Sequence, residues 1–289
     1  MITASLYSDP TCPFGYSTSP TQRVLEWRYG DQLDWRLVVI VLSDDPAQIE
    51  ASGFTPLRLA TSQVTLRRYG MPFAPEPKPR VAASSHACRA VQAARMLAPG
   101  SEWAAYRALQ FAHFTTAGVL DEDGTIREAL ATWTDLEADA AISLIDTAEV
   151  EAAYERDRAD ARTAAGSAAV LQGKASIQGD TVRYTAGTIA FQNGGERMVA
   201  GGFQPLEAYD VLIVNIDPSL ERRPAPDSPL PVLNHFRAGV TTQEVAAVLA
   251  SGNEPPDRPG AERALLELVA DGAASRTPLG DDALWRTAA

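Results

Sequence analysis

The chain has 289 residues and a formal net charge of −12, with 45% hydrophobic and 21% charged residues. Its length allows one full hydrophobic core with a small second domain, and its charge disfavours a nucleic-acid or anionic-membrane partner. No apolar run reaches the roughly 18 residues of a membrane span, and the start MITASLYSDP lacks the pattern of a signal peptide. Since two cysteines suit a reducing compartment rather than a disulfide scaffold, we expect a cytoplasmic protein.

The start of the chain predicts a βαβ unit. Residues 2–7 are short, apolar and rich in β-formers, which is typical of a strand, and residues 14–28 have a helical pattern. Pro13 suits the first turn of that helix, because its missing N–H would be unpaired there. Residues 33–42 end as a continuous apolar run, which indicates a buried strand in a parallel pairing.

The middle of the chain predicts helices, and strands return late. Apolar residues recur at helical spacing in residues 55–70, 82–98, 101–117, 124–132, 135–146 and 148–163. Asp135 and Thr147 are expected to be N-caps. Residues 181–192 and 196–202 read as strands joined by an Asn193-Gly194-Gly195 turn, and residues 203–217 read as a helix with Pro205 in its first turn.

This order, β-α-β, helices, then β-β-α, is that of an α/β thioredoxin fold with a helical insertion. We expect residues 1–54 and 166–220 to form the thioredoxin-like domain and residues 55–165 the inserted helical domain. Residues 221–231 read as a Pro-rich linker. The remaining residues of the range 228–289 predict three helices and a β-hairpin, the order of a small winged-helix-like domain.

The third helix of this C-terminal domain would be the one that reads DNA. It carries Glu262, Glu267 and Asp271 against Arg258 and Arg263. Because binding to DNA requires clustered Lys and Arg, we expect a packing or protein-interaction module and no nucleic-acid partner.

Two segments carry a resemblance to a known family. DPTCPFGY, around Cys12, resembles the active-site segment of the DsbA-like thioredoxin-fold family, including its FrnE-like branch. YTAGTIAFQNGGERMVAGGFQPLEAYD resembles the third and fourth strands and the last helix of that family. In the family, a Pro-x-Cys sequence follows the first cysteine, whereas this chain has Gly15 in place of the second cysteine. Gly187 stands where the family has a cis-proline beside the active cysteine.

The resemblance implies a site built around one thiol. Cys12 is the expected catalytic residue, and a helix N-terminus would stabilise its thiolate and lower its pKa. The expected substrate- or thiol-binding residues around it are Thr11, Pro13, Phe14, Gly15, Gly187 and Thr188, of which Thr11 and Thr188 would donate hydrogen bonds. With Gly15 in place, no disulfide can form within the motif. Cys88 alone could resolve Cys12 within the chain, but its helical context favours simple packing.

Two classes of function remain open. In the first, the protein is a thiol-dependent oxidoreductase, transferase or isomerase that acts through Cys12. SDPTCPFGY is similar to the DF-x-SP-x-x-Y pattern of kappa-class glutathione transferases and 2-hydroxychromene-2-carboxylate isomerases, which position a glutathione thiolate. This implies a small-molecule thiol or electrophile as the partner, such as glutathione or mycothiol. We expect no tightly bound cofactor, no metal site and no membrane partner. A homodimer is left open. In the second, the protein is a noncatalytic binding or scaffold protein.

Overall fold

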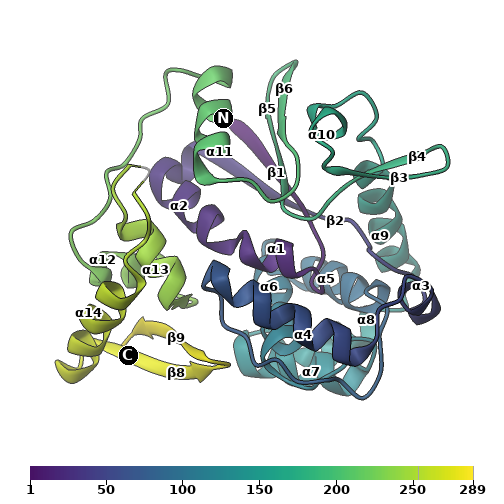
Figure 1. The fold of residues 1–289 in the computed structure, drawn as a ribbon, viewed down its shortest axis with the longest axis horizontal. Coiled ribbons are helices and arrows are strands. Elements are labelled where there is room, and N and C mark those ends of the chain that lie inside the picture. Colours follow the sequence, from purple (N-terminus) through teal and green to yellow (C-terminus); the bar gives the residue numbers. More distant parts are fainter. Residues whose placement is uncertain (253, 289) are drawn as a thin grey trace.

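The computed structural model describes residues 1–252 and 254–288, and a four-stranded mixed sheet forms its centre (Figure 1). The strand order is β2-β1-β5-β6; β1 and β2 run parallel, and β5 runs antiparallel to both of its neighbours. The strands are β1 (Ile2–Ser8), β2 (Leu33–Val39), β5 (Thr188–Asn193) and β6 (Glu196–Ala200). This confirms the expected thioredoxin-type sheet.

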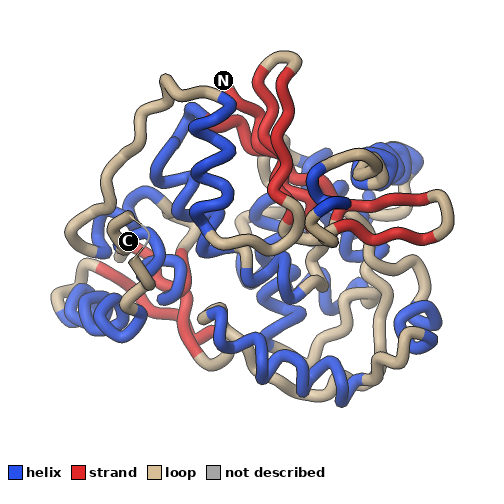
Figure 2. The backbone as a smooth tube through the Cα atoms, turned by 45° about the horizontal axis from the view of Figure 1, so that its top comes forward, coloured by secondary structure: helices blue, strands red, loops and turns tan. Residues whose placement is uncertain are grey.

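The expected single strand over residues 181–192 is wrong. β4 (Thr181–Tyr184) pairs instead with β3 (Ala175–Gln178) in a separate hairpin, which projects from one side of the molecule in Figure 2. The chain breaks before β5 at Gly187, whose φ of +86° lies in the region that favours glycine. A residue pattern rich in β-formers thus spans two different sheets.

The helix expected over residues 14–28 is divided in two. α1 (Pro13–Ser17) and α2 (Ser19–Tyr29) are separated at Thr18, and a short 3₁₀ turn, η1 (Gly30–Gln32), follows. Pro20 has no N–H to donate to the preceding turn, which explains the interruption. After the sheet, α11 (Leu206–Ile216) begins directly behind Pro205.

The segment between β2 and β5 is largely helical, as expected. Its elements are α3 (Pro46–Ala51), α4 (Pro56–Leu66), η2 (Arg67–Tyr69), α5 (Ser85–Leu97), α6 (Glu102–Thr115), α7 (Asp123–Trp133), α8 (Ala138–Leu144), α9 (Ala148–Ala161) and α10 (Ala168–Leu171). α3 and α10 were not expected. Thr147 caps α9, whereas the cap expected at Asp135 is wrong, because α8 starts later, behind Glu137.

One hydrophobic core joins the sheet to these helices. Leu6 and Leu37 from the sheet lie in the same buried cluster as Val91 of α5, Leu109 of α6 and Ile213 of α11. The helices therefore do not pack as a body with a core of their own. The domain boundaries remain a prediction.

The C-terminal segment forms a second, smaller layer. It contains α12 (Pro229–His235), β7 (Val240–Thr241), α13 (Thr242–Leu249), α14 (Arg258–Ala270), β8 (Ala274–Leu279) and β9 (Asp282–Thr287), with strand order β7-β9-β8. The three helices and the hairpin lie where they were expected, except that α12 starts inside the expected linker. Val24 and Trp27 of α2 share a core with Val245 and Trp285, so this segment packs on α2.

Buried polar contacts also hold the C-terminal segment in place. Glu244 of α13 is fully buried and accepts two hydrogen bonds of 2.5 Å from the Arg107 guanidinium of α6. The turn between β8 and β9 pairs with the chain after η2: Asp281 donates its N–H to the carbonyl of Phe73, and its carboxylate accepts the N–H of Phe73. The tip of the hairpin is therefore bound within the molecule.

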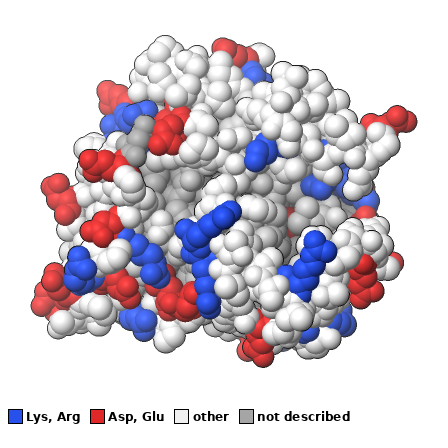
Figure 3. Space-filling view, viewed as in Figure 1, with Lys and Arg blue, Asp and Glu red and all other residues white. Residues whose placement is uncertain are grey.

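Charged side chains are unevenly distributed over the face seen in Figure 3. Acidic and basic side chains intermingle at the lower left, over the C-terminal segment, whereas the central part is mostly uncharged and shows basic side chains. Within the described residues, no helix combines the length and the apolar character that a membrane span requires.

Candidate active site

Cys12 occupies the N-cap of α1, as the sequence predicts. Its backbone is extended (φ −83°, ψ 117°), and its carbonyl accepts the N–H of Tyr16 at 2.9 Å, which closes the first turn. Pro13 holds the first helical position, where its missing N–H costs nothing. The Cys12 side chain is half-buried against an apolar cluster that includes Ala161, Ala164 and Ala186.

Asp9 organises the loop that carries Cys12. Its side chain is fully buried; one oxygen accepts the N–H (2.8 Å) and the hydroxyl (2.7 Å) of Thr11, and the other accepts the N–H of Leu42 (2.9 Å) and the Cys88 thiol (3.6 Å). The Thr11 hydroxyl is thus used by Asp9, which corrects its expected role as a donor to Cys12. Asp9 is not among the site residues expected from the sequence, although a carboxylate directly behind a buried strand was an available signal.

The expected activation of Cys12 is not found. Burial raises the pKa of the Cys12 thiol to about 11, and the nearby Asp9 carboxylate also raises it. The backbone N–H groups of Gly15 and Phe14 and the cation of Arg183 act in the opposite direction but do not outweigh burial. A helix of five residues offers only a short dipole, so loss of hydration decides the pKa of this thiol.

Gly15 explains why a second cysteine is absent from the motif. A Cβ atom there would lie 2.3 Å from the Ser8 hydroxyl and 3.5 Å from the Tyr106 hydroxyl. These two hydroxyls are hydrogen-bonded to each other at 2.6 Å, and Gln110 donates to Tyr106 at 2.8 Å. The space for a resolving thiol is filled by a buried polar pair.

Gly187 lies close to the break between α1 and α2. A Cβ atom on Gly187 would lie 2.7 Å from the Thr18 hydroxyl, and Ala186 lies 3.5 Å from the corresponding position on Gly15. The segment before β5 therefore runs along α1, in agreement with the expected pairing of the two motifs. That Cys12 itself faces Gly187 and Thr188 stays a prediction.

Thr188 is committed to internal hydrogen bonds. Its hydroxyl donates to the Thr185 carbonyl and accepts the N–H of Gly202, both at 2.7 Å, and its own N–H bonds the Thr185 carbonyl at 3.2 Å. The side chain is fully buried. The hydroxyl proton of Thr188 is thus used within the chain, and a role of Thr188 in binding substrate or thiol stays a prediction.

An aromatic group lies beside the Cys12 loop. Phe14 is 43% exposed, and its ring centroid lies 6.5 Å from that of Tyr69 and 6.3 Å from that of Phe203. These residues come from α1, η2 and the loop before α11. Their partly exposed rings offer apolar surface for a ligand next to the thiol.

Cys88 is unsuited to a role in solution chemistry. It is fully buried in α5, and burial raises the pKa of its thiol well above the usual range. Its thiol donates to Asp9. The expected packing role of Cys88 fits this environment.

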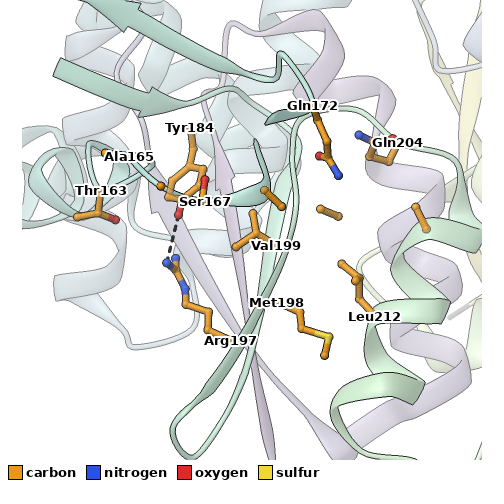
Figure 4. Close-up of a pocket in the computed structure, with 14 residues that line it drawn as sticks. Thr163, Ala165, Ser167, Gln172, Tyr184, Arg197, Met198, Val199, Gln204 and Leu212 are labelled. Atoms are coloured by element: carbon orange, nitrogen blue, oxygen red, sulfur yellow. Dashed lines mark hydrogen bonds between the residues drawn. The ribbon is translucent and has the colours of Figure 1, made fainter. Parts of the chain in front are cut away.

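A cavity of about 590 Å³ lies away from Cys12, around β6. Figure 4 shows Arg197 and Tyr184 on one side of the strand and Met198 and Leu212 on the other, with Arg197 donating to the Tyr184 hydroxyl at 3.1 Å. Neither Cys12 nor Gly187 lines this cavity. Among the residues that the structure describes, no group of three or more His, Cys, Asp or Glu is placed to hold a metal ion.

Comparison with known proteins finds solved structures with a similar fold, but no similar sequence. No protein-family model and no curated protein sequence matches the chain. Solved structures do match. The cytosolic disulfide reductase DsbM from Pseudomonas aeruginosa is 19% identical with a TM-score of 0.52, covering 74% of this chain and 98% of its own. The same protein with GSH is 20% identical with a TM-score of 0.51, covering 74% and 99%.

A structure described as a "putative protein disulfide isomerase", from Nitrosomonas europaea, is 13% identical with a TM-score of 0.55 and covers 74% of this chain and 96% of its own. Each match leaves about a quarter of this chain uncovered. From the strand order, the helical segment between β2 and β5, and these matches, we conclude that the chain has the thioredoxin fold with helical insertion of the DsbA-like proteins.

Proposed function

We propose that the protein is a thiol-dependent oxidoreductase or transferase that acts through Cys12 alone, with a low-molecular-weight thiol as partner. One observation carries the proposal: Cys12 caps the first helix, while the Ser8–Tyr106 pair occupies the space of a second thiol at Gly15. The GSH present in one DsbM structure supports a small thiol as the partner, and the cytosolic origin of DsbM supports a cytoplasmic location.

The chemistry requires one protein thiol. The Cys12 thiolate attacks one sulfur of a substrate disulfide, so that a mixed disulfide forms and the other sulfur leaves as a thiolate. The thiolate of the small thiol then attacks the substrate sulfur of the mixed disulfide. A disulfide between substrate and small thiol forms, and Cys12 returns as a thiolate.

The raised pKa of Cys12 favours a second candidate. With a pKa of about 11, the thiol is almost fully protonated at neutral pH, and the protonated form is a poor nucleophile. In this alternative, the protein is a noncatalytic binding or scaffold protein that keeps the fold and has lost the redox activity.

The test compares Cys12→Ser with Cys88→Ser. With glutathione as the thiol and hydroxyethyl disulfide as the substrate, we expect turnover and a mixed disulfide of the protein with 2-mercaptoethanol by intact mass in the wild type and in Cys88→Ser, and neither in Cys12→Ser. Turnover that survives in Cys12→Ser would overturn the role of Cys12, and a wild type without turnover or adduct would favour the scaffold protein.

For the C-terminal segment, we propose a winged-helix-like interaction module that does not bind nucleic acid. The turn at Asp281, which would form the tip of the wing, is bonded to Phe73 and to Arg67 at 2.8 Å. Acidic side chains on α14 add electrostatic repulsion toward a phosphate backbone. Both features disfavour contact with DNA, so we propose that this surface contacts another protein.

A further inference from the structure

Two arginines beside Cys12 have no carboxylate partner. Arg162 follows the last residue of α9, and Arg183 lies in β4; both are half-buried. Among the described residues, no carboxylate lies within ion-pair distance of either guanidinium, although most other buried or half-buried arginines have such a partner. In a chain with a net charge of −12, two cations left unpaired together are a notable exception.

A backbone bridge joins the two segments that carry these arginines. Thr163 and Val182 form an isolated β-bridge, and the N–H of Ala164 donates to the Val182 carbonyl at 3.2 Å. Arg162 and Arg183 are the residues next to this bridge. Burial and the charge of Arg162 lower the pKa of Arg183, and burial and the charge of Arg158 lower the pKa of Arg162.

Arg162 and Arg183 lie beside the apolar cluster against which Cys12 packs. Ala161, Val182 and Tyr184, which adjoin the arginines in sequence, pack in or against the apolar cluster that contacts Cys12. Arg162 donates to the carbonyl of Ile40 at 3.5 Å, and Ile40 is part of this cluster. Arg183 and Cys12 affect each other's ionisation, with the cation lowering the pKa of the thiol.

Both guanidiniums keep free hydrogen-bond donors. Arg183 donates only to the Tyr184 carbonyl at 3.0 Å, and Arg162 only to the carbonyls of Arg158 and Ile40. A guanidinium has five N–H donors. The charge of the Asp9 carboxylate raises the pKa of Arg183. However, both oxygens of Asp9 already accept hydrogen bonds from Thr11, Leu42 and Cys88.

We propose that Arg162 and Arg183 form a carboxylate-binding subsite that orients an anionic ligand with its reactive atom at Cys12. Guanidinium groups match carboxylates in geometry and charge. The subsite deepens the proposed function, on which it rests, because it selects the kind of thiol: glutathione has two carboxylates, whereas mycothiol is a sugar conjugate without any. The structure thus favours a carboxylate-bearing thiol or substrate.

The first test uses iodoacetate and iodoacetamide, which alkylate a thiolate with loss of iodide and differ only in the carboxylate. Their rates at Cys12 are measured by peptide mass, so that Cys88 is read separately. Relative to free glutathione as a reference thiol, we expect the iodoacetate-to-iodoacetamide rate ratio at Cys12 to be raised, and Arg183→Gln or Arg162→Gln to lower it roughly tenfold. Arg156→Gln, which removes an exposed charge on the same helix, should leave the ratio unchanged.

A second measurement separates this subsite from the proposed function. In the Cys12→Ser variant, calorimetry compares the binding of glutathione with that of its dimethyl ester. We expect glutathione to bind more tightly, and the difference to disappear when Arg183→Gln is added. If iodoacetamide labels Cys12 but the arginine variants leave the ratio unchanged, the subsite is wrong and the proposed function stands.

If neither reagent labels Cys12, the proposed function fails and calorimetry decides the subsite. Tighter binding of glutathione that depends on Arg183 would then support it, and equal binding of glutathione and its ester would overturn it.

Discussion

Gly15 determines which chemistry the Cys12 loop can carry, because its missing side chain leaves room for the Ser8 hydroxyl. The Tyr106 hydroxyl donates to Ser8 and receives a hydrogen bond from Gln110, so the pair is satisfied although it is buried. Replacing such a network with a thiol would require both a shift of the backbone and the loss of hydrogen bonds. The packing around Gly15 therefore leaves no space for a second thiol at this site.

We predict that Gly15→Cys does not restore a dithiol site and lowers the free energy of unfolding by about 1–3 kcal/mol, the usual cost of overpacking. Urea unfolding measures the change. Gly195→Cys is the matched control, because a Cβ atom at Gly195 meets no atom within 4 Å. A Gly15→Cys protein that is as stable as the control, and whose introduced thiol forms a disulfide with Cys12, would contradict this account.

The pKa of Cys12 gives a prediction on the pH dependence of its reactivity. Because burial holds the pKa near 11, the thiolate fraction should rise about tenfold per pH unit below that value. The rate of alkylation by iodoacetamide should therefore keep climbing between about pH 8 and 10, whereas the rate for free glutathione flattens near its ordinary thiol pKa of about 8.5. A rate that levels off below pH 8 would show an activated thiolate.

At the residue scale, the sequence predicted the helix N-cap position of Cys12 and missed the contacts around it. The N-cap position of Cys12 follows from local order, a strand, a turn and then Pro13. The hydroxyls of Thr11 and Thr188 bond to Asp9 and Thr185, two and three residues earlier, which are local turn contacts that were overlooked. Only the bond from Gly202 to Thr188 depends on the tertiary fold. Arg162 and Arg183 lie in different elements, and no periodic pattern links them.

At the scale of elements, the existence of the helices and strands was easier to predict than their boundaries. The order of strands and helices followed from hydrophobic periodicity. The break at Gly187 was hidden because β4 and β5 are rich in the same β-formers, and the choice between one strand and two depends on which sheet each joins. The division between α1 and α2 had a visible signal in Pro20.

The contact of α13 with α6 leads to a stability prediction. Glu244 is buried, which acts to raise its pKa, but the charge and hydrogen bonds of Arg107 outweigh burial and hold the pKa at about 2. Removing one partner of a buried pair costs about 3 kcal/mol or more, so Glu244→Gln should destabilise the protein by that amount in urea. Arg127→Gln is the control, because its partner Asp139 is exposed and such pairs contribute little.

The sign of the pH dependence follows from the lowered pKa. The stabilisation from ionised Glu244 is fully present above pH 4.5 and is lost as the pH falls from about 4.5 toward 2. In Glu244→Gln, the loss of stability between pH 6 and 3 should be smaller than in the wild type. Identical losses in the two proteins would show that Glu244 does not carry this acid sensitivity.

For the whole molecule, we predict no binding to duplex DNA. The net charge of −12 and the internally bound turn at Asp281 disfavour contact of the C-terminal segment with phosphates. Fluorescence anisotropy with random duplex at low salt should show no change. A triple change of Glu262, Glu267 and Asp271 to lysine is the control, and it should gain weak, salt-sensitive binding; micromolar binding by the wild type would reverse the prediction.

The pairing of Asp281 with Phe73 has a consequence for biosynthesis. The apolar cluster of Tyr16, Phe73 and Phe114 is closed by Leu279 and Leu284, which follow every strand of the thioredoxin sheet in the chain. During synthesis, this aromatic surface stays uncovered after the thioredoxin sheet has all its strands, because folding proceeds from the N-terminus. A chain that ends before β8 would therefore keep this aromatic surface exposed.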